Sequence, residues 1–317
     1  MSRPERILAL CGGVGGAKLA LGLSQVVEGD NLTIAVNTGD DFEHLGLRIC
    51  PDIDTVTYTL AGIVNPETGW GRANESGHFM EALADLGGED WFYLGDRDLA
   101  LHVERSRRLG TGDKLDSITA DIARRLGISA RILPMSNDEV ATMVETTGGP
   151  LAFQHYFVRE RCEPPVTGFH FVGIEHAQPH PDLLDALADD SFSAVILCPS
   201  NPFVSVAPIV NLPGVRQALR ACPAPVIAVS PIVGGQAVKG PTAKMMKELG
   251  LEPSSVAVLQ QYADFIDGFV LDQRDQDCLE EVRTLVDRVE VTDTLMIDMA
   301  RKVAVAEKVL DFAQRCR

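Results

Sequence analysis

The chain has 317 residues, of which 45% are hydrophobic and 23% charged, and its 45 acidic and 28 basic side chains give a formal net charge of −17. This composition is typical of a globular protein with a substantial core. The negative charge argues against binding to nucleic acid or to an anionic membrane, because both repel an acidic protein. Seven scattered cysteines, never spaced as C-x-x-C, favour reduced thiols and a cytoplasmic location over a disulfide or zinc framework.

The first predicted unit is a strand, a tight turn and a helix. An apolar run at 7–11 precedes a glycine-rich turn, and apolar residues at helical spacing occupy 19–27. The four glycines of the turn are Gly12, Gly13, Gly15 and Gly16. Backbone amides without side chains, together with the helix N-terminus, can bind an anion such as phosphate, with Lys18 close by. The alternative is a turn that serves only strand-to-helix packing, and the spacing matches neither a dinucleotide fingerprint nor a P-loop.

Two acidic segments follow. The predicted strand at 32–36 ends in the sequence Asn37-Thr38-Gly39-Asp40-Asp41. The carboxyl ends of parallel strands are where open α/β sheets bind ligands, although Asx residues also serve as plain turn formers. Asp52 and Asp54 are predicted in the first turn of a helix, where both could serve as caps and Asp54 could instead be a functional carboxylate. Because clustered carboxylate oxygens bind hard cations, Asp54 and Asp41 are interpreted as holding a metal ion or a substrate hydroxyl.

A third polar cluster, at 95–98, is predicted to follow a short strand at 91–94 and to face the same pocket. Helices are predicted over 99–108 and 115–126. The first of these helices carries three arginines that are expected to form a solvated face: Arg105, Arg107 and Arg108.

The alternation of strands and helices predicts a Rossmann-like α/β fold, with a mostly parallel sheet and helices on both faces. The rhythm changes at about 138–181, which predicts an inserted α+β lobe that covers one end of the pocket. A single domain over 1–317 is the expected organisation. An amphipathic helix at 298–317 is expected to pack on the sheet or on a second subunit, and a homodimer is the expected assembly.

The second half of the chain repeats the pattern of a strand followed by a polar loop. A strand at 194–198 ends in a loop with Ser200 and Asn201, and beyond a second strand at 225–229 lie Lys239 and Lys244. These residues are candidates for contacts with an anionic ligand.

Taken in order, these segments resemble the CofD family, the 2-phospho-L-lactate transferases of coenzyme F420 biosynthesis. The resemblance rests on the glycine turn through Lys18 and on the sequences NTGDD (37–41), PDIDT (51–55), GDRD (95–98), PMS (134–136), PSNP (199–202), SPI (230–232) and GP (240–241). It extends to Asp293-Thr294-Leu295-Met296 and so covers nearly the whole chain.

The resemblance implies an Mg²⁺-dependent phosphotransferase. Its donor would be a GDP-linked three-carbon acid, its acceptor the terminal ribityl hydroxyl of the deazaflavin Fo, and GMP would leave. Asp41 and Asp54 are then expected at the reaction centre as catalytic and metal-binding groups, with Asp40 as a further metal ligand. The expected substrate contacts are the four glycines, Lys18, Asn37, Thr38, Asp96, Arg97, Ser200, Asn201, Lys239 and Gly240, with Asp96 and Arg97 at the Fo pocket.

Two other functions stay open at this point. Relatives of the YvcK type resemble regulatory nucleotide-sugar binders that share the glycine loop, and membership of that group would make the chain a non-enzymatic binding protein. A dinucleotide-dependent oxidoreductase is disfavoured by the broken glycine fingerprint. The residues do not distinguish phospholactate, phosphoenolpyruvate and phosphoglycerate as the three-carbon group, because these groups differ by a hydroxyl or a double bond.

Overall fold

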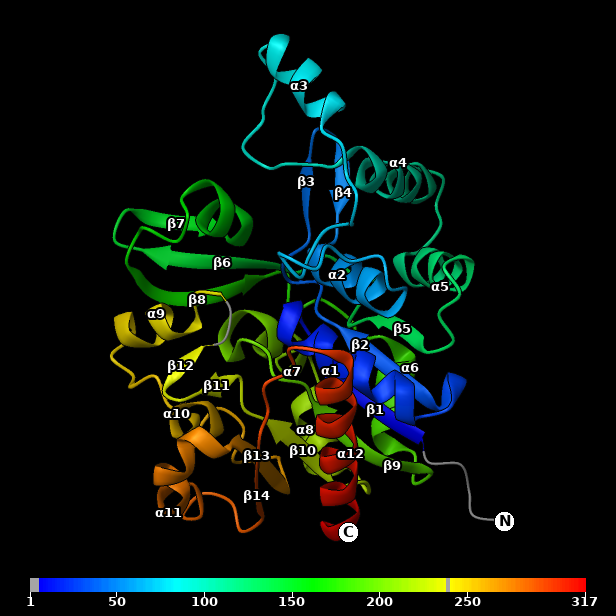
Figure 1. Ribbon diagram of the computed structural model, residues 1–317. Helices are drawn as coiled ribbons and strands as arrows, with labels where there is room; N and C mark the ends of the chain where they lie inside the picture. The colour runs from blue at the N-terminus through cyan, green and yellow to red at the C-terminus, as the bar shows by residue number, and fades with distance from the viewer. Residues whose placement is uncertain (1–5, 238–239) are drawn as a thin grey trace.

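A seven-stranded sheet forms the centre of the protein, and its neighbouring strands are all parallel (Figure 1). The computed structural model describes residues 6–237 and 240–317, so the predicted substrate residue Lys239 lies outside the described residues. In spatial order the strands are β14 (Val289–Thr292), β13 (Gly268–Asp272), β10 (Val226–Val229), β9 (Phe192–Leu197), β1 (Arg6–Cys11), β2 (Leu32–Val36) and β5 (Arg131–Pro134). The predicted Rossmann-like α/β fold is confirmed.

Helices cover both faces of the sheet, because successive residues of each buried strand point to opposite sides. In β1, Ile7 and Ala9 belong to one hydrophobic core and Leu8 and Leu10 to the other. The first core includes residues of α1 (Gly13–Val26), α2 (Pro51–Leu60), α5 (Leu115–Arg125) and α12 (Met299–Arg315). The second includes residues of α6 (Pro181–Ala188), α7 (Ala207–Val210), α8 (Val215–Arg220), α10 (Ser255–Leu259) and α11 (Leu279–Val282).

The order of the strands reverses between β1 and β9. From β1 the chain proceeds outward through β2 and β5, whereas from β9 it proceeds to the other edge through β10, β13 and β14. Loops on either side of such a reversal diverge and leave a crevice at the carboxyl edge of the sheet. The loop after β1 carries the glycines, and the loop after β9 carries Ser200 and Asn201, so the fold brings these two predicted segments together.

An arm projects beyond the carboxyl edge of the sheet (Figure 1). We define the arm as the hairpin β3–β4 (Phe42–His44 and Leu47–Ile49), helix α3 (His78–Asp85) and helix α4 (Asp96–Gly110). A small core of its own holds it together, built on Ile49, Met80 and Leu94. The predicted strand at 91–94 was wrong: these residues form an irregular segment that packs in that core instead of pairing with the sheet. Consequently, Asp96 and Arg97 begin helix α4 and do not follow a strand.

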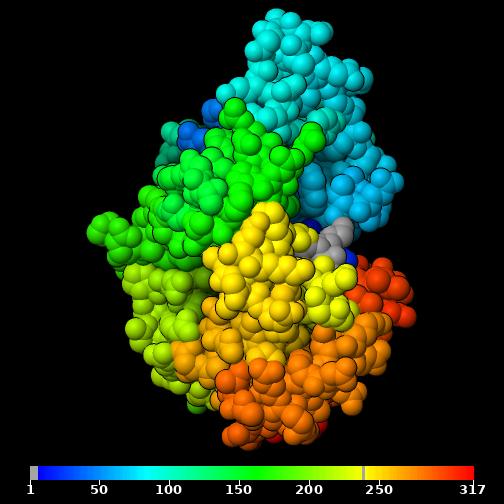
Figure 2. Space-filling model, turned by 90° about the vertical axis from the view of Figure 1, so that its left-hand side faces the viewer, coloured from blue at the N-terminus to red at the C-terminus, as the bar shows by residue number. Residues whose placement is uncertain are grey.

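Residues of the predicted inserted lobe form a separate three-stranded antiparallel sheet. Its strands are β6 (Ala141–Thr146), β7 (Gly149–Ala152) and β8 (Val166–Val172), with the π-helix η2 (His155–Arg159) after β7. Figure 2 shows this lobe in green directly above the yellow segment that contains α9 (Thr242–Glu248). The lobe and the arm therefore both stand over the carboxyl edge of the central sheet.

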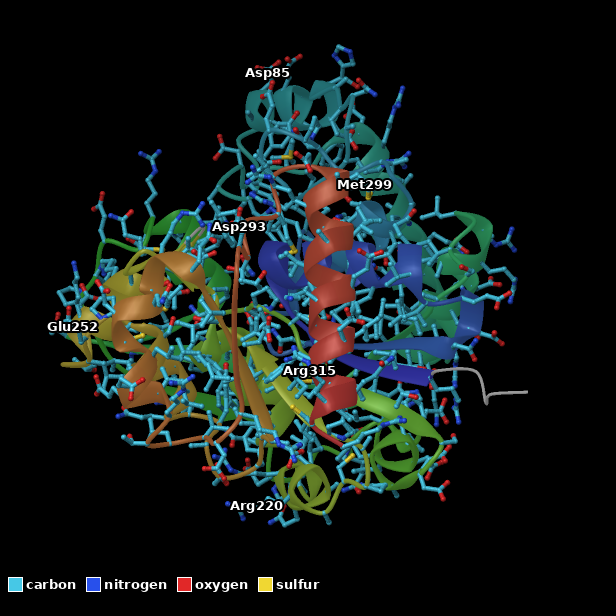
Figure 3. All side chains as sticks on the ribbon, turned by 60° about the horizontal axis from the view of Figure 1, so that its bottom comes forward. Asp85, Arg220, Glu252, Asp293, Met299 and Arg315 are labelled. Carbon is cyan, nitrogen blue, oxygen red and sulfur yellow. The ribbon has the colours of Figure 1, made fainter. Side chains whose placement is uncertain are left out.

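The C-terminal helix α12 lies against α1, and Met299 and Arg315 mark its two ends in Figure 3. The helices approach so closely that a Cβ on Gly22 would lie 2.2 Å from the carbonyl oxygen of Lys302. The predicted packing on the sheet side is confirmed, with α12 ending at 315 instead of 317. Among the described residues, no helix has the length and apolar character that a membrane span requires.

The remaining elements are short. They are the 3₁₀-helices η1 (Gly29–Asn31) and η4 (Gln273–Cys278), the π-helix η3 (Pro202–Val206) and the hairpin β11–β12 (Ile232–Val233 and Gln236–Ala237). All seven cysteines are free thiols, as the sequence predicted.

Candidate functional site

A cavity of about 540 Å³ lies at the carboxyl edge of the central sheet. Loops that follow five of the seven strands contribute to its wall, through Gly12, Asp40, Ser200, Ser230 and Thr294. The arm and the lobe supply the opposite side. The cavity therefore lies where a doubly wound sheet places its ligand, at the reversal between β1 and β9.

The glycine loop serves both packing and the cavity. Helix α1 begins at Gly13, earlier than predicted, so the loop becomes the first turn of a helix whose N-terminus faces the cavity. Gly12 exchanges two hydrogen bonds with the Ser200 hydroxyl, which donates to the Gly12 carbonyl at 2.6 Å and accepts from its amide at 3.3 Å. A Cβ on Gly15 would lie 2.3 Å from the Pro199 carbonyl oxygen, and one on Gly16 would lie 2.7 Å from Cys11 Sγ.

These contacts divide the four glycines into two groups. Gly12, Gly13 and Gly15 line the cavity, whereas Gly16 is buried against Cys11 and Ser200. The anion-binding and packing interpretations of the loop therefore both describe part of it. Packing alone explains Gly16, and the exposed amides at the start of α1 remain available to an anion.

Asp40 and Asp52 form an acidic pair on the cavity wall. Asp40 follows β2 and Asp52 lies in the first turn of α2, and each is only 6% exposed. Burial raises the pKa of Asp52 to about 6, against hydrogen bonds from Asn37 and the backbone of Gly13. Burial and the charge of Asp52 raise the pKa of Asp40 well above its usual value. Since no described arginine pairs with either carboxylate, a bound cation would relieve their repulsion.

Asn37 and Thr38 lie behind this acidic pair. Asn37 is fully buried and donates from Nδ2 to Asp52 Oδ2 at 2.9 Å and to the Val204 carbonyl at 3.3 Å. Thr38 is also buried, and neither residue belongs to the cavity wall. Asn37 therefore orients a cavity carboxylate instead of contacting a ligand itself.

Asp41 occupies a different environment from Asp40. Its side chain is fully buried, does not line the cavity, and lies 3.7 Å from Arg48 Nη2. Burial raises the pKa of Asp41 to about 7, although the charge of Arg48 works in the opposite direction. Of the two adjacent aspartates, the structure thus brings Asp40 to the cavity and holds Asp41 behind its wall.

Asp54 lines the cavity and is held from behind by helix α4. The guanidinium of Arg105 grips both of its carboxylate oxygens, from Nη1 to Oδ2 at 3.0 Å and from Nη2 to Oδ1. His102 fills the space beside this pair, with Nδ1 3.4 Å from Arg105 Nη1 and Nε2 3.3 Å from Asp98 Oδ1. Tyr58 donates to the same Asp98 oxygen at 2.5 Å.

We call Tyr58, Asp54, Asp98, His102 and Arg105 the α4 network. Burial opposes the charged form of Asp98, but hydrogen bonds from His102 and Tyr58 outweigh it, so the pKa of Asp98 lies below its usual value. For Arg105, burial would lower the pKa, yet the charge of Asp54 raises it above its usual value. The network thus keeps Asp98 ionised and Arg105 protonated.

The prediction of a solvated face was wrong for Arg105, which is 2% exposed. Asp98, His102 and Arg105 follow one another at intervals of four and three residues, and this spacing places them on one face of a helix. That interval was a usable signal in the sequence. Arg107 does lie in solvent and pairs with Glu104 on the same helix.

Asp96 and Arg97 are not brought to the cavity. The Asp96 carboxylate accepts hydrogen bonds from the Ser76 hydroxyl at 2.6 Å and from the Phe79 amide at 3.0 Å, and so caps the start of α3. The Arg97 side chain is exposed. Within this segment it is Asp98 that lines the cavity.

Other predicted substrate contacts lie on the cavity wall. Lys18, Ser200, Asn201 and Gly240 all line it, the last with a left-handed φ of +78°. Asn201 is held by the Phe203 amide, which donates to its Oδ1 at 2.9 Å.

Aromatic side chains form the side of the cavity that faces away from the sheet. The arm and its approach contribute Trp70, Trp91, Phe92 and Tyr93, and the lobe contributes Phe153 and Phe157. The two parts touch through the rings of Trp91 and His155, whose centroids are 4.7 Å apart. We call these six lining residues the aromatic wall. A flat, conjugated ligand would find here a surface for stacking.

The described residues contain no group of three or more His, Cys, Asp or Glu side chains arranged to hold a metal ion. Mg²⁺ commonly takes only one or two protein carboxylates and completes its octahedron with water and substrate phosphates. Asp40 and Asp52 meet that requirement, and Asp40 Oδ1 makes no hydrogen bond to any described residue. The residues present therefore fit a magnesium ion that binds together with a phosphate ligand.

Comparisons with known proteins identify the family of this chain. A family model described as 2-phospho-L-lactate transferase CofD matches residues 7–310. The chain is 39% identical over 318 residues to the phosphoenolpyruvate transferase of Streptomyces griseus, covering 98% of this chain and 99% of that protein. It is 38% identical over 304 residues to the 2-phospho-L-lactate transferase of Methanosarcina acetivorans, covering 96% and 98%.

Among solved structures, a UPF0052-family protein of Bacillus halodurans superposes with a TM-score of 0.63. The match covers 96% of this chain and 99% of that one, at 14% sequence identity, and so supports the fold. The family match and the identities over nearly full length establish the classification: this chain belongs to the CofD family of phosphotransferases.

Proposed function

We propose that this protein transfers a phospho-three-carbon-acid group from a GDP-linked donor to the deazaflavin Fo, with release of GMP, in coenzyme F420 biosynthesis. The observation that carries the proposal is the composition of the cavity, where an acidic edge and a helix N-terminus face an aromatic wall. A phosphate ligand with its metal suits the first part, and a ring system suits the second.

The reaction is a displacement at phosphorus. The terminal hydroxyl oxygen of Fo forms a bond to the phosphorus that carries the three-carbon group, and the bond from that phosphorus to the bridging oxygen of the diphosphate breaks. GMP leaves with this oxygen, and the proton of the attacking hydroxyl is released to solvent. Such transfers require little covalent chemistry from the protein and depend on positioning and charge neutralisation.

Asp54 is the group that we assign to the acceptor hydroxyl. It lines the cavity, and both of its oxygens are fixed by Arg105, yet each oxygen retains a lone pair that can accept a hydrogen bond. In this role Asp54 orients the hydroxyl and accepts its hydrogen bond during attack.

Asp40 and Asp52 are the residues that we assign to Mg²⁺, with Asp41 as a buried support behind them. When bound, the ion supplies neutralisation of the phosphate charge. Without a cation, the carboxylates of Asp40 and Asp52, with which no described arginine pairs, would repel a diphosphate. Lys18 and the amides at the start of α1 add positive potential on the donor side.

The aromatic wall is the part of the cavity that we assign to the deazaflavin ring of Fo. This places the acceptor between arm and lobe and the GDP-linked donor along the loops after β1, β9 and β10. Asp96 then acts at a distance, since it caps α3 in the arm next to the aromatic wall, whereas the exposed Arg97 is assigned no substrate contact.

The test is direct. The purified protein is incubated with Fo, Mg²⁺ and one GDP-linked donor at a time, carrying phospholactate, phosphoenolpyruvate or phosphoglycerate, and product mass and GMP are measured. We expect GMP release only when Fo and Mg²⁺ are both present. The curated relatives include both phosphoenolpyruvate and 2-phospho-L-lactate transferases, so the three donors must be compared in parallel. Binding of a UDP-sugar without affinity for Fo would instead support a regulatory nucleotide-sugar binder. The homodimer and the cytoplasmic location stay predictions from the sequence.

A further inference from the structure

Arg105 is a charged side chain in the interior of the protein, where its burial costs free energy. It is among the largest fully buried side chains of the described residues, and its Nε makes no hydrogen bond to any of them. Removing a guanidinium from water costs several kcal/mol, and well-packed apolar side chains often stabilise a fold as well as a buried ion pair does. A buried arginine at this position is therefore weak evidence for a stabilising role, which leaves room for another contribution.

The contacts of Arg105 point to that contribution. Its fork occupies both oxygens of Asp54, and Nη1 also lies 3.4 Å from the Arg48 carbonyl, so the guanidinium has one orientation. Asp54 lines the cavity, whereas Arg105 does not. Arg105 can therefore influence a ligand only through the cavity residues that it contacts, namely His102 and, through the two-point ion pair, Asp54.

His102 restricts the same pair from the side. Because an arginine can only donate, its approach to His102 Nδ1 makes that nitrogen an acceptor, which leaves the ring proton on Nε2 beside Asp98. Tyr58 fixes Asp98 in turn. The position of Asp54 is thus determined by α4 as well as by its own helix α2.

We propose that Arg105 is a positioning residue for the transfer: by gripping both oxygens of Asp54 it fixes the carboxylate in the orientation that receives the acceptor hydroxyl. This role rests on the proposed function. It separates two kinds of carboxylate on the cavity wall, namely Asp54, whose charge is neutralised and whose orientation is fixed, and the pair Asp40 and Asp52, which remains open to a cation.

The test uses Arg105→Lys, which keeps the charge but loses the planar fork, and Asp54→Asn, alone and combined. We expect Arg105→Lys to lower kcat about 10- to 100-fold, since small displacements of a reacting group cost that much, while KM for both substrates changes by less than about twofold. Arg107→Lys is the matched control, because Arg107 lies on the same helix in solvent. It should leave kcat unchanged.

A role through Asp54 predicts non-additivity. The double variant should be no slower than Asp54→Asn alone. Once the Asp54 carboxylate is removed, Arg105 has no carboxylate left to orient, so its substitution should add no further loss of kcat. Multiplicative losses would contradict the proposal, as would an Arg105→Lys variant with normal kcat. A variant that fails to fold would assign Arg105 to stability instead and would overturn the positioning role.

A crystal structure of Arg105→Lys provides a readout that does not depend on turnover. We expect the Asp54 carboxylate to leave its rotamer, and an unchanged Asp54 would reject the proposal even if the enzyme used other substrates. Absence of turnover in the wild-type protein with all three donors would reject the proposed function, and the structure would still decide the role of Arg105.

Discussion

The carboxyl edge of the sheet and the arm contribute to one cavity in different ways. At the edge, Gly12, Asp40 and Ser200 each follow a buried strand of the central sheet, and they meet because parallel strands end together. In the arm, the functional residues Asp98, His102 and Arg105 lie inside a helix. Their position depends on which face of α4 turns inward, and only the packing of the arm decides that.

The two regions also differ in the charged partners and the pKa values of their carboxylates. At the edge, Asp40 and Asp52 have no arginine partner among the residues that the structure describes, and burial raises the pKa of Asp52 to about 6. In the α4 network, Arg105 neutralises Asp54, and the pKa of Asp98 is lowered once hydrogen bonds from His102 outweigh burial. The difference indicates two roles. The carboxylates at the edge are available to bind a cation, and the arm fixes Asp54 as a hydrogen-bond acceptor.

Removing the Asp52 carboxylate should produce the largest effect on activity. We expect Asp52→Asn to lower kcat by about 100-fold or more and to raise the Mg²⁺ concentration needed for half-maximal activity, because a transition-state charge loses its counter-ion. Steady-state kinetics across a Mg²⁺ titration measures both. Asp85→Asn, at the exposed tip of the arm in Figure 3, is the control and should behave as the wild type. An unchanged Mg²⁺ requirement would remove Asp52 from the metal site.

The glycine loop gives the next largest effect, on stability. Gly15→Ala places a Cβ 2.3 Å from the Pro199 carbonyl oxygen, and neither backbone can move freely at the junction of β1 and β9. We expect a loss of about 1–3 kcal/mol in the free energy of unfolding, measured by urea denaturation. Gly110→Ala, whose Cβ would meet nothing within 4 Å at the end of α4, should be neutral or slightly stabilising. Equal stability of the two variants would contradict the packing role.

The contrast between the edge and the arm also explains which parts of the fold and of the cavity could be predicted from the sequence. The Rossmann-like fold and the approach of the glycine loop to Ser200 followed from the alternating elements and from the loops that end strands. Asp40, Lys18 and Asp54 were predicted from a strand end, the glycine loop and a helix start, and Gly240 from the family resemblance, and all four line the cavity. Asp52 was identified only as a helix cap, because capping and ligand binding require the same residue at the same position.

Predictions failed where tertiary packing overrides a local pattern. An apolar segment at 91–94 resembles a strand, yet it packs in the small core of the arm and supplies ring surfaces to the cavity. Asp41 and Asp40 are adjacent and chemically identical, and only the turn after β2 decides which one faces the ligand. No spacing rule within the sequence distinguishes them.

A smaller effect is expected at the aromatic wall. Trp91→Ala removes a ring that contacts His155 of the lobe, and we expect KM for Fo to rise about 3- to 10-fold with little change for the donor, since an aromatic pair contributes about 0.5–1.5 kcal/mol beyond its buried area. Trp91→Phe preserves a stacking surface and should recover most of the affinity. A rise in KM for the donor instead would reverse the assignment of the two substrates within the cavity.

Asp41 provides the smallest and most specific contrast with the cavity carboxylates. Burial raises its pKa from 3.8 to about 7, so between these pH values the folded protein binds a proton that the unfolded chain releases. Stability of the wild type must therefore fall as the pH rises through this window, and Asp41→Asn removes that loss. We expect the Tm of the variant to gain on the wild type by a few degrees from pH 4 to pH 8, on the order that such shifts produce in a chain of this size.

Asp264→Asn tests the opposite sign, because hydrogen bonds from Arg216 lower the pKa of Asp264 to about 2 and its contribution disappears only as the pH falls below about 4. Its Tm difference should stay flat between pH 5 and 8, and a flat difference for Asp41→Asn as well would show that this carboxylate is stabilised by Arg48 instead of being strained by burial.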